Sequence, residues 1–166
     1  SACYNRPVGI EIERKFLVSS ARLGSLENGE DITQGFITTA DLTAVRVRTA
    51  GERAWLTIKG ENKGAVRLEF EYAIPINHAR QILDQLCSGP VISKTRYRRQ
   101  FQGYEWEIDV FHGENSGLVV AEVELQSEQE KPDLPDWVLE EVTGDTRYYN
   151  VNLVDCPYSQ WRNEGI

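Results

Sequence analysis

Apolar residues alternate with polar, mostly charged ones in at least seven segments of this 166-residue chain, and this recurring pattern is the strongest constraint on its fold. In the first segment, residues 10–16, Glu11, Glu13 and Lys15 fall on one face and apolar residues fall on the other. A period of two is typical of a β-strand with one buried face. Because the polar face is charged on most of the segments, the pattern indicates a closed, water-filled interior lined with ionised groups.

Short turns connect most of these segments, which predicts antiparallel strands. The predicted strands cover residues 10–16, 32–38, 44–49, 54–59, 65–73, 91–101, 104–111 and 118–126. Eight antiparallel strands can close into a barrel that has no free edges. We therefore expect a mainly β (α+β) fold, an eight-stranded antiparallel β-barrel that forms a charge-lined tunnel with helices packed on the outside.

Helical periodicity is clear in one place, from an expected N-cap at Asn77 to Leu86. A second helix is expected from Leu134 to about Thr143, followed by a short helix or turn over residues 146–153. We expect one domain spanning residues 1–166, with irregular tails at about 1–8 and 156–166. The apolar faces of the strands would point outward and pack under the helices and loops, or against a partner subunit. A homodimer is therefore compatible with the pattern.

The charged positions that share the inward parity are nearly balanced in sign. They are Glu11, Glu13, Lys15, Arg46, Arg48, Lys59, Arg67, Glu69, Glu71, Lys94, Arg96, Arg98, Glu105, Glu107, Asp109, Glu122 and Glu124. An ordinary solvated sheet face could carry such cross-strand ion pairs, each contributing under about 1 kcal/mol. Here, however, the signs are grouped by strand: residues 94–98 supply bases on this parity and residues 105–109 supply acids. Grouped bases facing grouped acids favour a polyanion bound together with divalent metal ions.

These residue types suit phosphate chemistry. Hard cations such as Mg²⁺ and Mn²⁺ take carboxylate oxygens and water as ligands, and Arg binds phosphate oxygens bidentately. Such a site can polarise a terminal phosphoryl group, orient a water in line and neutralise charge on the leaving phosphate.

The overall composition argues against several other classes of protein. The net charge of −8 disfavours a general nucleic-acid or anionic-membrane binder, and no apolar run reaches the roughly 20 residues of a membrane span. The three cysteines have no metal-like spacing, which predicts free thiols in a reducing cytoplasm.

An ordered set of motifs runs along nearly the whole chain. They are Glu11-Ile12-Glu13-Arg14-Lys15, Gln34-Gly35-Phe36, Val45-Arg46-Val47-Arg48, Thr57-Ile58-Lys59-Gly60, Arg67-Leu68-Glu69-Phe70-Glu71, Lys94-Thr95-Arg96-Tyr97, Glu105-Trp106-Glu107-Ile108-Asp109, Glu122-Val123-Glu124 and the closing residues 141–150. The first is similar to the ExExK motif of the CYTH superfamily, the triphosphate tunnel metalloenzymes. The closing stretch resembles the short bacterial single-domain branch with inorganic triphosphatase activity.

This resemblance implies an Mg²⁺- or Mn²⁺-dependent reaction at a triphosphate, and it implies roles by position. Catalysis would rest on Glu11, Glu13 and Lys15; substrate would be bound by Lys15, Arg46, Arg48, Lys59, Lys94 and Arg96; metal would be bound by Glu11, Glu13, Asp109, Glu122 and Glu124. Second choices are Arg67, Glu69, Glu71, Glu105 and Glu107. Phe36 stands where the family resemblance leads us to expect Tyr, so a hydroxyl is lost at that position.

Several functions are compatible with these residues. The favoured one is metal-dependent hydrolysis of inorganic tripolyphosphate to pyrophosphate and phosphate. Adenylyl cyclase and thiamine triphosphatase are alternatives within the same superfamily. A polyphosphate- or nucleotide-binding module without turnover is an alternative outside the enzyme class, although a pure anion binder would have little use for so many acids.

Overall fold

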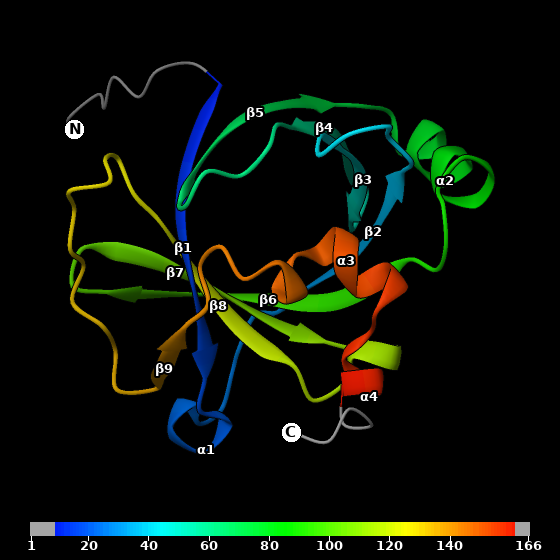
Figure 1. Ribbon diagram of the computed structural model, residues 1–166. Coiled ribbons are helices and arrows are strands. Elements are labelled where there is room, and N and C mark those ends of the chain that lie inside the picture. Colours follow the sequence, from blue (N-terminus) through cyan, green and yellow to red (C-terminus); the bar gives the residue numbers. More distant parts are fainter. Residues whose placement is uncertain (1–8, 162–166) are drawn as a thin grey trace.

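The computed structural model describes residues 9–161 and shows a closed antiparallel β-barrel, as predicted from the alternation (Figure 1). Its strands are β1 (Ile10–Val18), β2 (Glu30–Ile37), β3 (Ala44–Ala50), β4 (Arg53–Lys59), β5 (Val66–Ala73), β6 (Ile92–Phe101), β7 (Tyr104–Phe111), β8 (Val119–Glu124) and β9 (Val138–Glu141). The order is β5-β4-β3-β2-β6-β7-β8-β1, and pairing of β5 with β1 closes the ring. The eight predicted strands therefore all exist and form the predicted barrel.

Strand β1 holds the barrel together because three strands pair with it. Its residues from Glu13 to Leu17 pair with β8, while residues 10–12 pair with residues 66–68 of β5. The last part of β1 pairs with β9, which lies beside the barrel as a ninth strand. The predicted helix from Leu134 to about Thr143 is therefore wrong: this stretch is extended, and pairing with the edge of β1 satisfies its backbone.

Helices and helical turns cover parts of the outside and one end of the barrel. They are α1 (Ser20–Leu23), α2 (Ile76–Gln85), η1 (Gly113–Asn115), η2 (Thr146–Tyr148), α3 (Asn150–Asp155) and α4 (Tyr158–Trp161). Helix α2 begins one residue before Asn77 and has Pro75 at its N-cap, so the predicted Asn77 cap is wrong. Helix α4 lies in the tail that was expected to be irregular, whereas residues 1–8 and 162–166 lie outside the described part. Among residues 9–161, no helix is long and apolar enough to span a membrane.

The apolar strand faces point outward and form three clusters beneath these coverings. Phe16 and Trp106 centre one cluster that is covered by the segment carrying Trp137. A second cluster packs under α3 and α4, and a third under α2. Gly35 makes the α2 contact close, because an added Cβ would lie 2.8 Å from the Cys87 Sγ. A side chain at that position would push the covering helix segment away from β2.

The outer face of β5 is an exception to this covering. Leu68 and Tyr72 are 54% and 56% exposed, and Phe70 beside them is also exposed. Within the described residues, helices and loops therefore leave this strand uncovered, and its covering by a partner subunit stays a prediction. These side chains face away from the barrel interior, and the functional site lies on the other face of the same strand.

Candidate active site

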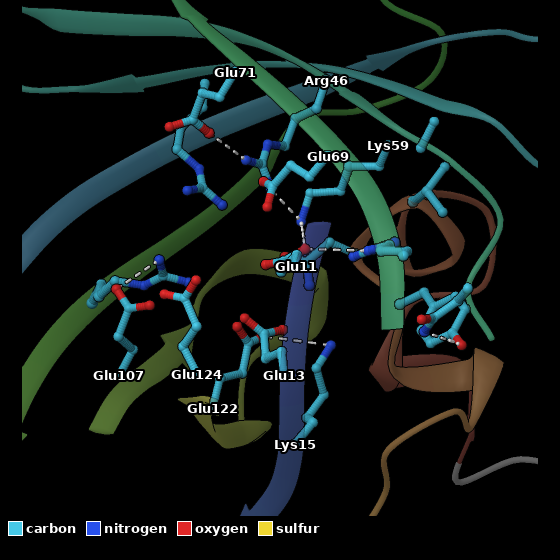
Figure 2. A pocket seen from close by; sticks show the side chains of 18 of the residues that line it. Glu11, Glu13, Lys15, Arg46, Lys59, Glu69, Glu71, Glu107, Glu122 and Glu124 are labelled. Carbon is cyan, nitrogen blue, oxygen red and sulfur yellow. Dashed lines mark hydrogen bonds and ion pairs between the residues drawn. The ribbon is translucent and has the colours of Figure 1, made fainter. Parts of the chain in front are cut away.

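A cavity of about 570 Å³ runs through the barrel and is lined mainly by ionised side chains. This volume is in the range of small-molecule sites. Its wall includes ten of the eleven predicted site residues: Glu11, Glu13, Lys15, Arg46, Arg48, Lys59, Lys94, Arg96, Glu122 and Glu124. Figure 2 shows Glu13 of β1 grouped with Glu122 and Glu124 of β8, whereas Glu11 lies apart from them beside Lys59. Of the second choices, Glu105 does not line the cavity and pairs with Arg98 at its edge.

The acidic part of the wall follows from strand register. Glu13 and Glu124 lie directly opposite each other on β1 and β8, and Lys15 lies opposite Glu122. Burial, together with the neighbouring carboxylates of Glu122 and Glu11, raises the pKa of Glu13 well above its usual range. Crowded carboxylates of this kind suit a divalent cation, which would relieve their repulsion and take oxygen ligands. Within residues 9–161, however, no three acidic, His or Cys side chains converge as a ready-made ligand cluster.

Asp109 has surroundings different from those of the other predicted metal ligands. It is 1% exposed and lies behind the cavity wall. Its Oδ2 accepts a hydrogen bond from Lys94 Nζ at 2.7 Å, and Arg96 binds both of its oxygens at 2.7 and 2.8 Å. Burial opposes ionisation of Asp109, but Arg96 and Lys94 hold the pKa of the carboxyl well below its usual range. The Asp109 carboxylate thus anchors two cations in the wall.

Other cavity cations have looser partners. Lys59 Nζ lies 3.4 Å from Glu11 and 3.5 Å from Glu69, and Lys15 Nζ lies 3.5 Å from Glu122. These separations exceed the usual length of a charge-assisted hydrogen bond. The ammonium groups are therefore only partly neutralised by the protein and can approach an added anion.

Arg48 is the cavity cation with the least compensation. Its Nε donates to the neutral Gln34 Oε1 at 3.0 Å, and no carboxylate of residues 9–161 forms an ion pair with it. Burial, together with the charges of Arg46 and Arg96, lowers the pKa of Arg48 to about 9. The guanidinium therefore stays charged at neutral pH in surroundings that disfavour its charge, an arrangement that an anion would stabilise.

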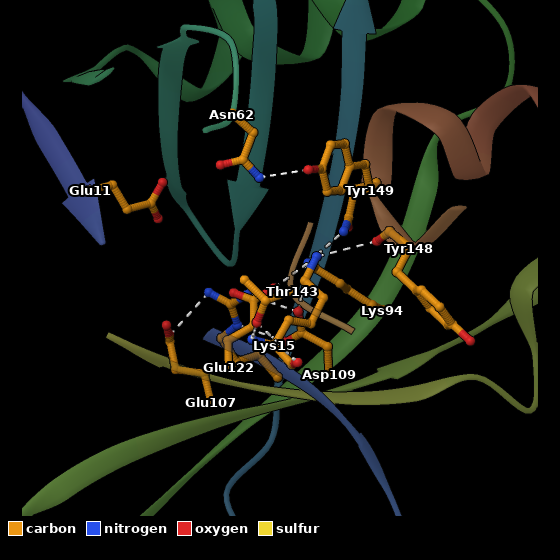
Figure 3. Close-up of polar contacts among 12 residues, drawn as sticks. Glu11, Lys15, Asn62, Lys94, Glu107, Asp109, Glu122, Thr143, Tyr148 and Tyr149 are labelled. Carbon is orange, nitrogen blue, oxygen red and sulfur yellow. Dashed lines mark hydrogen bonds and ion pairs between the residues drawn. The ribbon is translucent and has the colours of Figure 1, made fainter. Parts of the chain in front are cut away.

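Polar residues of the C-terminal segment close in on one end of the cavity. Asn62, in the loop between β4 and β5, donates to the Tyr149 hydroxyl at 2.7 Å, and Lys15 Nζ donates to the Tyr148 carbonyl at 3.2 Å (Figure 3). Asn150 Oδ1 accepts from Lys94 Nζ at 3.0 Å. The sequence motifs assigned no role to Asn62, Tyr149 or Asn150, although Tyr149 and Asn150 belong to the closing motif. Gln34 likewise had no assigned role, although it belongs to Gln34-Gly35-Phe36.

Phe36 also lines the cavity, where its ring joins the apolar cluster under α3. The hydroxyl of a tyrosine is therefore absent beside this part of the wall. The nearby polar contacts are made instead by the amides of Gln34 and Asn150.

A closed β-barrel that encloses a cavity of facing acids and bases defines a tunnel protein for a small polyanion. The chain matches the CYTH domain family over residues 9–154 and belongs to that family. It is 48% identical over 155 residues to an inorganic triphosphatase of Acetivibrio thermocellus, covering 93% of this chain and 99% of that protein. It is 38% identical over 147 residues to an inorganic triphosphatase of Nitrosomonas europaea, covering 86% of this chain and 95% of that one.

Solved structures confirm the barrel. A crystal structure of an inorganic triphosphatase superposes with a TM-score of 0.61 at 36% identity, and the match covers 87% of this chain and 93% of the other. The resemblance drawn from the motifs and the fold drawn from the alternation are thus both confirmed.

Proposed function

We propose that this protein hydrolyses inorganic tripolyphosphate to pyrophosphate and phosphate in a reaction that depends on a divalent metal. The observation that carries the proposal is Arg48, a charged side chain that a neutral amide holds in the cavity and that has no carboxylate partner among residues 9–161. A polyanion would supply the missing charge. The naming of two similar proteins as inorganic triphosphatases supports the same substrate.

The cavity cations divide the work of binding. Lys15, Arg46, Arg48, Lys59, Lys94 and Arg96 would hold the phosphates, as the motifs predict. Neutralising the phosphate oxygens favours attack on the terminal phosphorus and departure of pyrophosphate. Asp109 would act through Lys94 and Arg96 as their anchor, rather than as the metal ligand predicted from the sequence.

The carboxylates Glu11, Glu13, Glu122 and Glu124 would hold Mg²⁺ or Mn²⁺, directly or through water. Such an ion polarises phosphoryl oxygens and lowers the pKa of bound water. One of these four carboxylates would position the attacking water or take its proton. Glu13 suits this place because it is flanked by Glu11 and Glu122.

The cavity lining bears on the class of substrate, and the cysteines bear on the cell compartment. A wall made largely of charged groups suits a ligand that consists entirely of phosphate, and a tunnel of this volume suits a small molecule rather than a nucleic acid. The free thiols of Cys87 and Cys156 fit the proposed cytoplasmic location. A homodimer and the absence of membrane association also stay as predictions.

Phosphate release tests the proposal. The wild type and Glu13→Ala are assayed with tripolyphosphate, ATP and thiamine triphosphate, with Mg²⁺ or Mn²⁺ and with EDTA. We expect chelator-sensitive release from tripolyphosphate that is lost in Glu13→Ala. Tight binding of tripolyphosphate without release would indicate the binding module instead, and faster turnover of ATP or thiamine triphosphate would indicate the alternative enzymes.

A further inference from the structure

Two side-chain amides, one buried and one half-buried, connect the cavity cations to helix α3. Gln34 is 0% exposed, and its Oε1 accepts from Arg48 Nε at 3.0 Å. Its Nε2 donates to Asn150 Oδ1 at 2.7 Å, and the same Oδ1 accepts from Lys94 Nζ at 3.0 Å. A continuous chain of hydrogen bonds thus runs from Arg48 on β3 through Gln34 on β2 and Asn150 on α3 to Lys94 on β6.

The direction of this chain is fixed by its two ends. Arg and Lys side chains can only donate, so Gln34 must present its oxygen to Arg48 and Asn150 must present its oxygen to Lys94. The Gln34 amide nitrogen then faces Asn150 Oδ1, which accepts from both sides. Neither amide can rotate without placing two donors against each other, so both side chains are locked in this orientation.

The neutral amide of Gln34 holds Arg48 without cancelling its charge. A carboxylate at this position would make an ion pair, as Asp109 does with Lys94 and Arg96. The bond to Gln34 occupies the Nε of Arg48, and no hydrogen bond to another group of residues 9–161 occupies its terminal nitrogens. Those nitrogens form the pair that binds a phosphate bidentately.

We propose that Gln34 and Asn150 form an amide relay that positions Arg48 toward the phosphates of the substrate while leaving its charge available, and that connects this arginine to Lys94, which Asp109 anchors. Both are positioning residues, and through Asn150 helix α3 becomes part of the substrate site. This inference rests on the proposed function, because it names the role of the relay in binding tripolyphosphate.

Gln34→Glu is the decisive variant, because it keeps the acceptor oxygen but adds a charge that pairs with Arg48. We expect KM for tripolyphosphate to rise about tenfold, since a charged hydrogen-bonding partner would be neutralised, with a much smaller change in kcat. The melting temperature should change little, because the new ion pair with Arg48 offsets the hydrogen bond to Asn150 that the carboxylate can no longer donate. A structural role alone would produce the opposite combination, a lower melting temperature with an unchanged KM.

Asn150→Asp repeats the test at the other end of the relay, where the side chain is only half-buried, and it should raise KM in the same way. Asn152→Ala is the matched control on the same helix. Its amide donates to the Thr146 carbonyl at 2.8 Å, on the exposed side and away from the relay. We expect its KM to stay at the wild-type value. An equal rise in KM for Asn152→Ala and Asn150→Asp would overturn the relay and indicate a general loosening of α3.

A double-mutant cycle isolates the bond itself. Arg48→Lys removes the Nε that Gln34 holds, so adding Gln34→Leu to it should raise KM no further, whereas Gln34→Leu alone should raise it. Additive effects would overturn the proposal. Calorimetric binding of tripolyphosphate in EDTA separates the two proposals. If the wild type releases no phosphate, the proposed function fails while the affinity ratios still test the relay; an active wild type with unchanged Gln34→Glu and Asn150→Asp variants overturns the relay alone.

Discussion

The tunnel holds its cations in two different ways, and the difference separates structure from binding. Lys94 and Arg96 are bound to Asp109 by contacts of 2.7 to 2.8 Å behind the wall. Lys15 and Lys59 have acidic partners at 3.4 to 3.5 Å, and Arg48 has only an amide as its partner within the part of the chain that the structure describes. We infer that the tight group, whose charge Asp109 already compensates, fixes the wall around the phosphates, while the loose group supplies most of the net positive charge that a polyanion meets.

Removing the carboxylate of the tight group should have the largest effect on stability. In Asp109→Ala, Lys94 and Arg96 would be left buried without their shared anion, which typically costs about 3–5 kcal/mol of unfolding free energy. Urea unfolding of the metal-free protein measures the change. Glu122→Gln, which removes the loose partner of Lys15, is the comparison and should cost much less. Equal losses in the two variants would erase the distinction between the groups.

Removing a loose cation should instead affect binding. Arg48→Gln is expected to raise KM for tripolyphosphate about tenfold to a hundredfold, since a charged hydrogen bond contributes roughly 1.5–3 kcal/mol. Its unfolding free energy should not fall, because Arg46 and Arg96 already repel this guanidinium. Arg80→Gln is the matched control, because Arg80 is an exposed arginine on α2 that pairs with Glu52. A destabilised Arg48→Gln protein with wild-type KM would place Arg48 in the tight group.

Filling the tunnel should stabilise the fold without any metal. With EDTA present and tripolyphosphate at a hundred times its Kd, the unfolding free energy should rise by about 2.7 kcal/mol. Thermal or urea unfolding at several ligand concentrations measures this, and added salt should weaken the effect. Stabilisation of Arg48→Gln to the same extent at the same ligand concentration would contradict the role of the loose group.

Much of this arrangement could be predicted because strand parity assigns each residue to a face. Glu11, Glu13 and Lys15 had to point the same way once their strand was assigned, and the barrel turned that face inward. Parity cannot say how deep a side chain lies or which groups neutralise it. The family resemblance placed Asp109 with the metal ligands, and neither signal indicated that Lys94 and Arg96 bind its carboxylate.

Two further features carry no local signal. The segment of β9 has Pro135 and polar residues that suit a helix start, and only its pairing with the edge of β1 makes it extended. Gln34 and Asn150 are neutral and lie 116 positions apart, so no periodicity connects them. Such contacts depend on how the C-terminal segment meets the end of the barrel, which is a property of the tertiary structure.

For the acidic wall we expect the smallest effect, a change in how steeply the unfolding free energy depends on pH, and the direction of this change is fixed. Burial and the carboxylates of Glu122 and Glu11 raise the pKa of Glu13, so the folded protein keeps a proton that the unfolded chain has already lost above about pH 4.5. Because the unfolded state then binds fewer protons, this group lowers stability as pH rises toward its folded pKa. Glu13→Gln carries no such proton. In EDTA, its unfolding free energy should therefore fall less steeply with pH than that of the wild type.

Urea unfolding of both proteins from pH 5 to pH 8 measures this difference in slope. Saturating Mg²⁺ should flatten the wild-type curve, because a cation among these carboxylates favours the ionised form of Glu13. Parallel curves for the wild type and Glu13→Gln in EDTA would show that Glu13 ionises normally. The carboxylates of the acidic wall would then be as well compensated as the tight cations around Asp109. The difference between tight and loose groups would hold only for the basic side chains.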